Sequence, residues 1–126
     1  SAVQVGTAYL LTPEATISPV YRKALANARD DGTAITNVFT GRPARSMINR
    51  AVREIGPMSP HAPAFPNAAN AMVPLRAKAE AAGSSDFTSL WSGQAARFAR
   101  DMPAAELTRN LARDALQRLA LGAPRA

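Results

Sequence analysis

Strand-forming segments are scarce in this chain, and that scarcity limits its possible folds more than any other feature. Two segments alternate apolar and polar residues as strands do, namely residues 2–6, which lead into a turn at Gly6, and residues 33–39. The first has no antiparallel partner next to it along the sequence, and two strands this short do not form a stable sheet alone. Because the chain also begins with Ser1 rather than Met, we interpret it as the C-terminal piece of a larger protein that supplies the missing strands.

The remaining sequence favours helices. Ser18 followed by Pro19 is typical of a helix start, because a serine hydroxyl caps the first turn and proline is tolerated there. Capping residues and apolar spacing predict helical segments over residues 18–29, 46–55, 67–82, 86–91 and 103–121. Pro74 predicts a kink or a split, and the proline-rich residues 56–66 predict a loop. We therefore expect a mostly helical chain with one or two strands.

The composition is that of a globular protein, with 47% hydrophobic and 19% charged residues among 126. The chain contains no cysteine, which excludes a disulfide scaffold, thiolate metal ligands, an iron–sulfur cluster and a cysteine nucleophile. Its longest apolar stretches are the size of residues 8–11, far short of the ~20 residues that cross a bilayer. We expect a cytoplasmic protein that does not bind a membrane.

The net charge of +6 comes mostly from arginine, which supplies thirteen of the fifteen Lys and Arg residues. Such a balance suggests nucleic acid or another anionic partner. The densest basic run is Arg42, Arg45, Arg50 and Arg53, and no aromatic residue lies between these arginines to stack on bases. We interpret the run as a turn and a solvated helix face, and a basic helical module that binds nucleic acid is an alternative function.

Residues for acid–base or metal chemistry are few. The single histidine, His61, lies in the proline-rich loop, and the sequence places no acid or nucleophile near it. The nine carboxylates are dispersed, and no metal-ligand spacing, Walker motif or dinucleotide glycine motif occurs. The sequence therefore predicts no catalytic residue and no metal site in this chain.

One short segment suits an anion, namely Gln4, Val5, Gly6 and Thr7. A strand that ends in Gly-Thr and turns at once into a helical stretch points several backbone N–H groups in one direction, and glycine lets a phosphate approach them. Phosphate sites of this kind recur in (β/α)8 barrels, after the seventh and eighth strands. A strand-to-helix turn without a ligand fits the same four residues.

Three longer stretches carry a resemblance to a known family. Residues 3–15, 39–45 and 90–96 resemble, in the same order, stretches in the C-terminal third of the bacterial nitronate monooxygenases, formerly called 2-nitropropane dioxygenases. The first stretch is shared with related flavin enzymes, including the flavin-dependent enoyl-acyl-carrier-protein reductases. The other two, which read Phe-Thr-Gly-Arg-Pro-Ala-Arg and Leu-Trp-Ser-Gly-Gln-Ala-Ala, are more specific to the monooxygenases.

The resemblance implies an α/β protein, an FMN-binding (β/α)8 TIM barrel with a mainly helical second domain inserted after its eighth strand. Residues 1–32 would then be the last barrel strand, the phosphate-binding turn and the following helix. Residues 33–100 would form the second, substrate-side domain, and residues 101–126 would return to the barrel as a helix.

The resemblance also implies where a flavin lies. Residues 4–7 would contact FMN, with Gly6 and Thr7 at its phosphate. Trp91 and Gln94 would face the flavin from the substrate side, across the cleft between the two domains. A histidine that serves the family as an active-site residue belongs upstream of these segments.

The implied activity is the FMN-dependent oxidation of alkyl nitronates by O2, which yields a carbonyl compound and nitrite. His61 does not match the family's histidine, so we expect the 126 residues alone to be inactive. An enoyl-acyl-carrier-protein reductase on the same barrel is the alternative enzyme, and it would consume NAD(P)H and release no nitrite. The nucleic-acid-binding alternative predicts an affinity for duplex DNA that falls steeply with salt.

Overall fold

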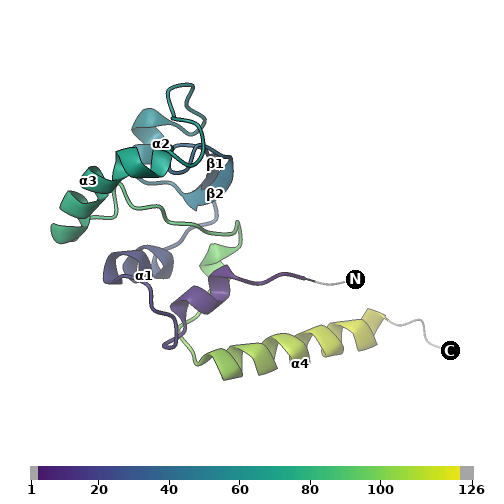
Figure 1. Ribbon diagram of the computed structural model, residues 1–126. Coiled ribbons are helices and arrows are strands. Elements are labelled where there is room, and N and C mark those ends of the chain that lie inside the picture. Colours follow the sequence, from purple (N-terminus) through teal and green to yellow (C-terminus); the bar gives the residue numbers. More distant parts are fainter. Residues whose placement is uncertain (1–2, 123–126) are drawn as a thin grey trace.

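Helices make up most of the regular structure, as the sequence predicts, and one small sheet accompanies them (Figure 1). The structure is a computed structural model that describes residues 3–122. Its elements, in chain order, are the 3-10 helix η1 (Thr7–Leu11), α1 (Pro19–Ala26), β1 (Thr33–Thr36), β2 (Ala44–Met47), α2 (Arg50–Ile55), α3 (Ala68–Ala81), the 3-10 helix η2 (Ala96–Phe98) and α4 (Ala104–Gly122).

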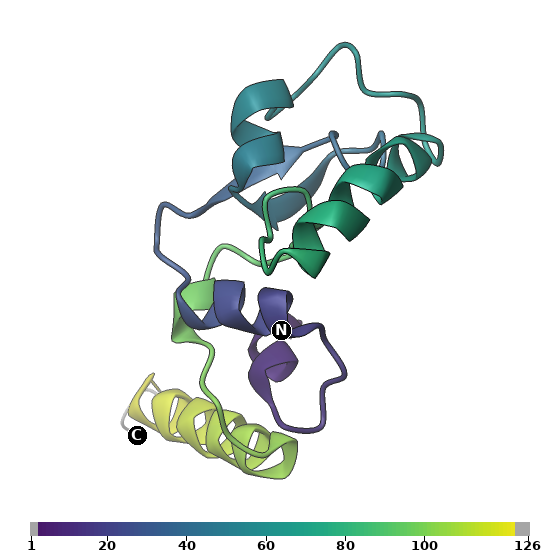
Figure 2. The ribbon, with the colours of Figure 1, turned by 90° about the vertical axis from the view of Figure 1, so that its left-hand side faces the viewer.

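These elements form two lobes, which we call the sheet lobe and the helical lobe (Figures 1 and 2). The sheet lobe holds β1, β2, α2 and α3, and the helical lobe holds η1, α1, η2 and α4. One buried cluster belongs to the sheet lobe and comprises Val38, Phe39, Ala51 and Val52. The other comprises Leu11, Leu25, Met47, Leu90 and Ala96. Because Met47 belongs to β2, this second cluster also joins the two lobes.

Residues 3–6 do not form the predicted strand. They run without regular structure into η1, and Val3 is 89% exposed. In this structure the strand predicted for residues 2–6 is therefore wrong for residues 3–6, and Ala2 lies outside the described residues. A strand needs a neighbour for its backbone hydrogen bonds, and within residues 3–122 no strand lies beside this segment.

Helix α1 begins where the sequence predicts. The Ser18 hydroxyl accepts a hydrogen bond from the Tyr21 N–H at 3.4 Å, and Pro19 occupies the first turn. The start of the helix is thereby confirmed. Its end comes earlier than predicted, because Asn27 leaves the helical conformation and its N–H closes the last turn.

Strands β1 and β2 pair as an antiparallel hairpin, with Thr33 opposite Met47. The strand predicted over residues 33–39 is confirmed at its start, but it ends at Thr36. The sequence assigns residues 46–55 to a helix, and that assignment is wrong at its start. Residues 46 and 47 belong to β2, and α2 begins at Arg50 after Asn49 caps it. The Asn49 side chain accepts a hydrogen bond from the backbone N–H of the third helical residue, at 3.3 Å.

The second edge of β2 explains this difference. The Met47 N–H donates to the Leu90 carbonyl oxygen at 2.9 Å, and the Ser92 N–H donates to the Arg45 carbonyl oxygen at 3.2 Å. These bonds keep Ser46 and its neighbours extended, whereas the apolar spacing alone favours a helix. The partner lies 44 residues further along the chain, so local spacing does not reveal it.

Two other helical predictions also differ from the structure, and one loop prediction is confirmed. Of the two outcomes predicted for Pro74, a kink or a split, the split is wrong, because Pro74 lies inside α3, which continues as one helix over Ala68–Ala81. The kink stays a prediction. Residues 86–91 form a turn and an extended end, because Trp91 pairs with Ser46 as an isolated bridge. Residues 56–66 form the predicted loop.

Helix α4 is attached to the helical lobe near its first turns. The Glu14 carboxylate accepts a hydrogen bond from the Ala104 N–H at 3.0 Å, and the Tyr9 and Thr108 hydroxyl oxygens are 2.8 Å apart. Hydrogen bonds from its own backbone N–H and from that of Ala104 hold the pKa of Glu14 below its ordinary value. No helix within residues 3–122, α4 included, has the length and apolar character needed to cross a membrane.

The turn between the strands generates a stability prediction. Gly41 has a φ of +84°, and a Cβ there would lie 2.3 Å from the Pro63 carbonyl oxygen. We expect Gly41→Ala to lower the free energy of unfolding by about 2–4 kcal/mol, because it adds backbone strain and a steric clash. Gly83→Ala is the matched control, since φ is +73° but nothing lies within 4 Å of the added Cβ. Urea unfolding of the control should show a loss of about 1–2 kcal/mol, and equal losses would contradict the clash.

The Tyr21 hydroxyl generates a pH prediction, because it donates a hydrogen bond to the Trp91 carbonyl oxygen. Burial raises the pKa of Tyr21 from 10.0 to about 12. The folded chain therefore binds this proton more tightly than the unfolded chain does. Its stabilising effect is complete below about pH 10 and is lost as the pH rises toward about 12. Urea unfolding across this range should show that decline in the parent protein and a shallower one in Tyr21→Phe; identical slopes would refute the assignment.

Candidate functional site

Two of the predicted site segments meet in the structure, although 86 residues separate them. The Thr7 side-chain oxygen Oγ1 accepts a hydrogen bond from the Gly93 N–H at 2.8 Å. Thr7 opens η1, and Gly93 lies between the extended residues 90–92 and η2. The contact therefore brings the predicted phosphate segment beside the stretch that contains Trp91 and Gln94.

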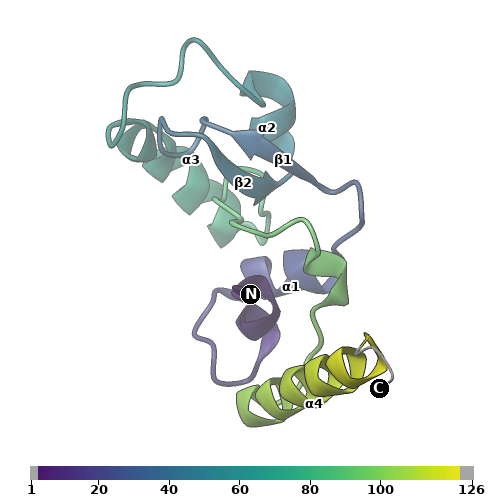
Figure 3. The same ribbon diagram turned by 90° about the vertical axis from the view of Figure 1, so that its right-hand side faces the viewer.

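A pocket of about 300 Å³ adjoins this contact, and we call it the Thr7 pocket. Residues of η1, η2 and α4 in the helical lobe contribute to its lining. Figure 3 shows how these elements are arranged. Its lining consists of residues 4–8, then Gly93, Ala95, Phe98 and Ala99, and finally Leu107 and Leu111 of α4. The structure thus places all four residues of the predicted phosphate segment on one pocket.

Gly6 is open to this pocket in a way that packing does not explain. A Cβ built on Gly6 would meet nothing within 4 Å, and its φ of −119° is one that any residue adopts. Neither a close contact nor a left-handed backbone therefore requires glycine here within residues 3–122. A ligand that occupies the space beside Gly6 would require glycine here, because a side chain would fill that space.

The backbone beside Gly6 offers hydrogen-bond donors. The N–H groups of Gly6, Thr7 and Ala8 donate to no acceptor within residues 3–122, because η1 bonds begin with the Tyr9 N–H and the Gly6 carbonyl oxygen. The Thr7 hydroxyl adds a side-chain group at the same place. Several donors around an open glycine suit a phosphate or another small anion.

Trp91 does not line the Thr7 pocket. Its ring packs edge-on against Phe39 with centroids 5.8 Å apart, and its carbonyl oxygen accepts the Tyr21 hydroxyl. Gln94 is exposed and does not line the Thr7 pocket; it borders a neighbouring hollow of about 370 Å³, which shares Phe98 with that pocket. The structure therefore brings the backbone of this stretch to Thr7 without bringing these two side chains there, and their role toward a flavin stays a prediction.

His61 lies apart from these groups and is exposed on the proline-rich loop. Its backbone N–H donates to the Ser59 hydroxyl at 3.3 Å. Within the described part of the chain, no three His, Asp or Glu side chains gather as metal ligands would. The described residues thus offer binding groups rather than a set for acid–base catalysis.

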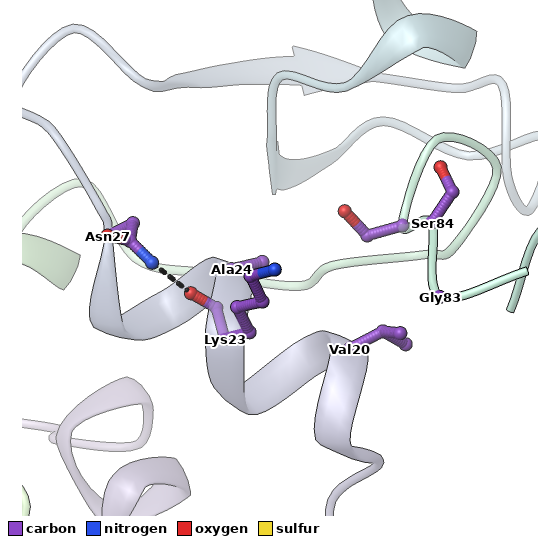
Figure 4. Close-up of a pocket in the computed structure, with 7 residues that line it drawn as sticks. Val20, Lys23, Ala24, Asn27, Gly83 and Ser84 are labelled. Atoms are coloured by element: carbon purple, nitrogen blue, oxygen red, sulfur yellow. Dashed lines mark hydrogen bonds between the residues drawn. The ribbon is translucent and has the colours of Figure 1, made fainter.

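Another hollow, of about 410 Å³, lies between α1 and the turn after α3 (Figure 4). It contains none of the predicted site residues. Two of its polar side chains are used within the chain. The Asn27 side chain donates to the Lys23 carbonyl oxygen at 2.8 Å. The Ser84 hydroxyl likewise accepts from the Asp86 N–H at 3.2 Å. We therefore place the candidate site at the Thr7 pocket.

Sequence reasoning names Thr7 and misses its partner. Gly93 stands next to Gln94 in the third family-like stretch, and that stretch is the signal that could have pointed to it. Phe98, which lines the Thr7 pocket, carries no comparable signal.

Comparison with known proteins decides the family. A family model described as nitronate monooxygenase matches residues 1–114. The chain belongs to the nitronate monooxygenase family. This confirms the resemblance that the three sequence stretches indicate, and it covers both segments that meet at Thr7 and Gly93.

Individual members of the nitronate monooxygenase family show the extent of the match. A nitronate monooxygenase of Pseudomonas aeruginosa is 43% identical over 112 residues, which are 88% of this chain and 32% of that protein. One of Paraburkholderia phytofirmans is 40% identical over 118 residues, 92% of this chain and 32% of that protein. A solved structure from a crystallographic and mutagenesis study of nitroalkane oxidase from Streptomyces ansochromogenes has a TM-score of 0.81 and 42% identity, covering 94% of this chain and 34% of that one. The chain spans about a third of the length of these relatives.

Proposed function

We propose that this chain is the C-terminal part of an FMN-dependent nitronate monooxygenase, which oxidises alkyl nitronates with O2 to carbonyl compounds and nitrite. The observation that carries the proposal is the family match over residues 1–114. The names of the relatives support the same activity, since two of them are called nitronate monooxygenases and one structure is of a nitroalkane oxidase.

In this proposal, the chain contributes residues that bind the cofactor. We assign residues 4–7 to FMN, with Gly6 and Thr7 at the phosphate, and the fit is supported by the open space at Gly6. The N–H groups of Gly6, Thr7 and Ala8, which donate to no acceptor within residues 3–122, match an anion that carries close to two negative charges. When bound, FMN supplies the electron transfer between nitronate and O2. The residues of this chain bind and orient its phosphate.

Exposed apolar residues support a barrel supplied by the rest of the longer protein. Val3 is 89% exposed, and Leu116 and Leu119 of α4 are 68% and 71% exposed. Burying a leucine side chain is worth about 1.5–3 kcal/mol, so several uncovered ones favour a further packing surface. We assign residues 1–32 and 101–126 to a TIM barrel and residues 33–100 to a substrate-side domain.

The catalytic residues of this reaction belong, in our proposal, to the other part of the protein. The described residues show no acid–base pair at the Thr7 pocket, and His61 lies on an exposed loop away from it. Within the substrate-side domain of this chain, we assign Trp91 and the exposed Gln94 to face the flavin. The substrates are then an alkyl nitronate and O2.

The activity is tested with the protein that includes the preceding coding sequence. Incubated aerobically with an alkyl nitronate, it should release nitrite and consume O2, whereas the 126 residues alone should do neither. Nitrite is measured colorimetrically and O2 with an electrode. Reduction of an enoyl thioester by NAD(P)H without nitrite would support the enoyl reductase instead. Salt-sensitive binding of duplex DNA, with no flavin bound, would support the nucleic-acid-binding module.

The phosphate assignment is tested by Gly6→Val. A branched side chain at this position enters the space that we assign to the phosphate, so we expect FMN affinity to fall by about tenfold or more. Thermal unfolding of the flavin-free protein should stay nearly unchanged, because nothing within residues 3–122 lies within 4 Å of the added Cβ. Unchanged flavin content in the purified variant would contradict the assignment of the FMN phosphate to this position.

A further inference from the structure

The Thr7 hydroxyl can still donate a hydrogen bond to a ligand. A hydroxyl group has one donor proton and two acceptor lone pairs, and the Gly93 N–H occupies one of the lone pairs at 2.8 Å. Within residues 3–122 this hydroxyl donates to no acceptor. The hydrogen bond from Gly93 therefore fixes the position of the oxygen and leaves the proton free for a group in the Thr7 pocket.

Gly93 is itself held firmly. Just before it, the Ser92 N–H donates to the Arg45 carbonyl oxygen of β2 at 3.2 Å. Just after it, the Gly93 carbonyl oxygen accepts the Ala96 N–H at 3.2 Å and the Ser92 hydroxyl at 3.1 Å. The position of the Gly93 N–H is thus set by the sheet on one side and by η2 on the other.

We infer that Gly93 is a positioning residue for the cofactor phosphate, because its N–H holds the Thr7 hydroxyl so that the hydroxyl proton is donated to the phosphate. The inference rests on the proposed function, since FMN is the cofactor assigned to this pocket. If the inference holds, the sheet lobe contributes to the phosphate site, because β2 fixes residues 90–92 and these residues position Gly93. Gly93 acts through Thr7 and does not touch the phosphate.

The chain offers matched variants for both residues. Thr7→Val removes the hydroxyl and keeps the shape, and Thr7→Ser keeps the hydroxyl. Gly93→Pro removes the N–H, and Gly93→Ala keeps it, with the new Cβ at an ordinary 3.4 Å from the Thr7 oxygen.

The readout is the affinity for FMN compared with that for riboflavin, which lacks the phosphate, measured on the longer protein by flavin fluorescence. Thr7→Val should weaken FMN binding by about tenfold while riboflavin affinity changes less than about twofold, and Thr7→Ser should recover most of the loss. Gly93→Pro should weaken FMN binding selectively as well. Gly93→Ala keeps the N–H and places its Cβ 3.4 Å from the Thr7 oxygen, so it should lose less FMN affinity than Gly93→Pro. Equal losses for both flavins would indicate a merely structural role and overturn the inference.

A double-mutant cycle separates positioning from an independent effect. If Gly93 acts through Thr7, the variant with Thr7→Val and Gly93→Pro binds FMN no more weakly than Thr7→Val alone. Additive losses would overturn the inference. A parent protein that binds neither flavin would refute the proposed function together with it, whereas a parent that binds FMN while Gly93→Pro keeps full FMN affinity refutes the inference alone.

A second measurement does not depend on the proline variant being folded. In 15N-labelled parent protein, the Gly93 amide resonance should shift on saturation with FMN and much less with riboflavin. Exchange of the Gly93 amide hydrogen should be faster in Thr7→Val than in Thr7→Ser, because the acceptor is lost. A Gly93 amide that responds equally to both flavins would contradict the inference.

Discussion

The hydrogen bonds along the second edge of β2 hold this structure together. Residues 90–92 lie against that edge through the Met47 N–H and the Ser92 N–H, and the Ser46 hydroxyl also donates to the Leu90 carbonyl oxygen at 3.0 Å. With β1 on its other side, β2 has both edges paired, so a sheet of two four-residue strands gains the third neighbour that such short strands need. The same bonds bring Leu90 into the cluster shared by the lobes and place Gly93 at Thr7.

The parts of the fold that depend on neighbouring residues follow from the sequence, and the parts that depend on distant residues do not. Ser18 and Pro19 predict the start of α1 correctly, because capping is local. The helix predicted from residue 46 fails because its first residues pair with residues 90–92. The strand predicted at residues 3–6 fails for a related reason, since its partner is not among the described residues.

In the candidate site too, features set by neighbouring residues can be predicted from the sequence, and features set by distant residues cannot. The Gly-Thr pair can be read from the sequence because a short glycine-containing turn has recognisable chemistry and recurs in the family. The contact between Thr7 and Gly93 can be found only once the chain is folded. The open space at Gly6 likewise appears only in the folded chain, because it depends on which atoms lie within reach of an added Cβ.

The uncovered side of α4 also has a consequence for handling the chain. Leu116 and Leu119 are on the surface, as is Val3 at the other end of the described chain. Adjacent exposed apolar side chains favour contact between molecules over contact with water. We therefore expect the isolated chain to self-associate more readily as its concentration rises. Its net charge of +6 opposes this association, and added salt weakens that repulsion by screening it.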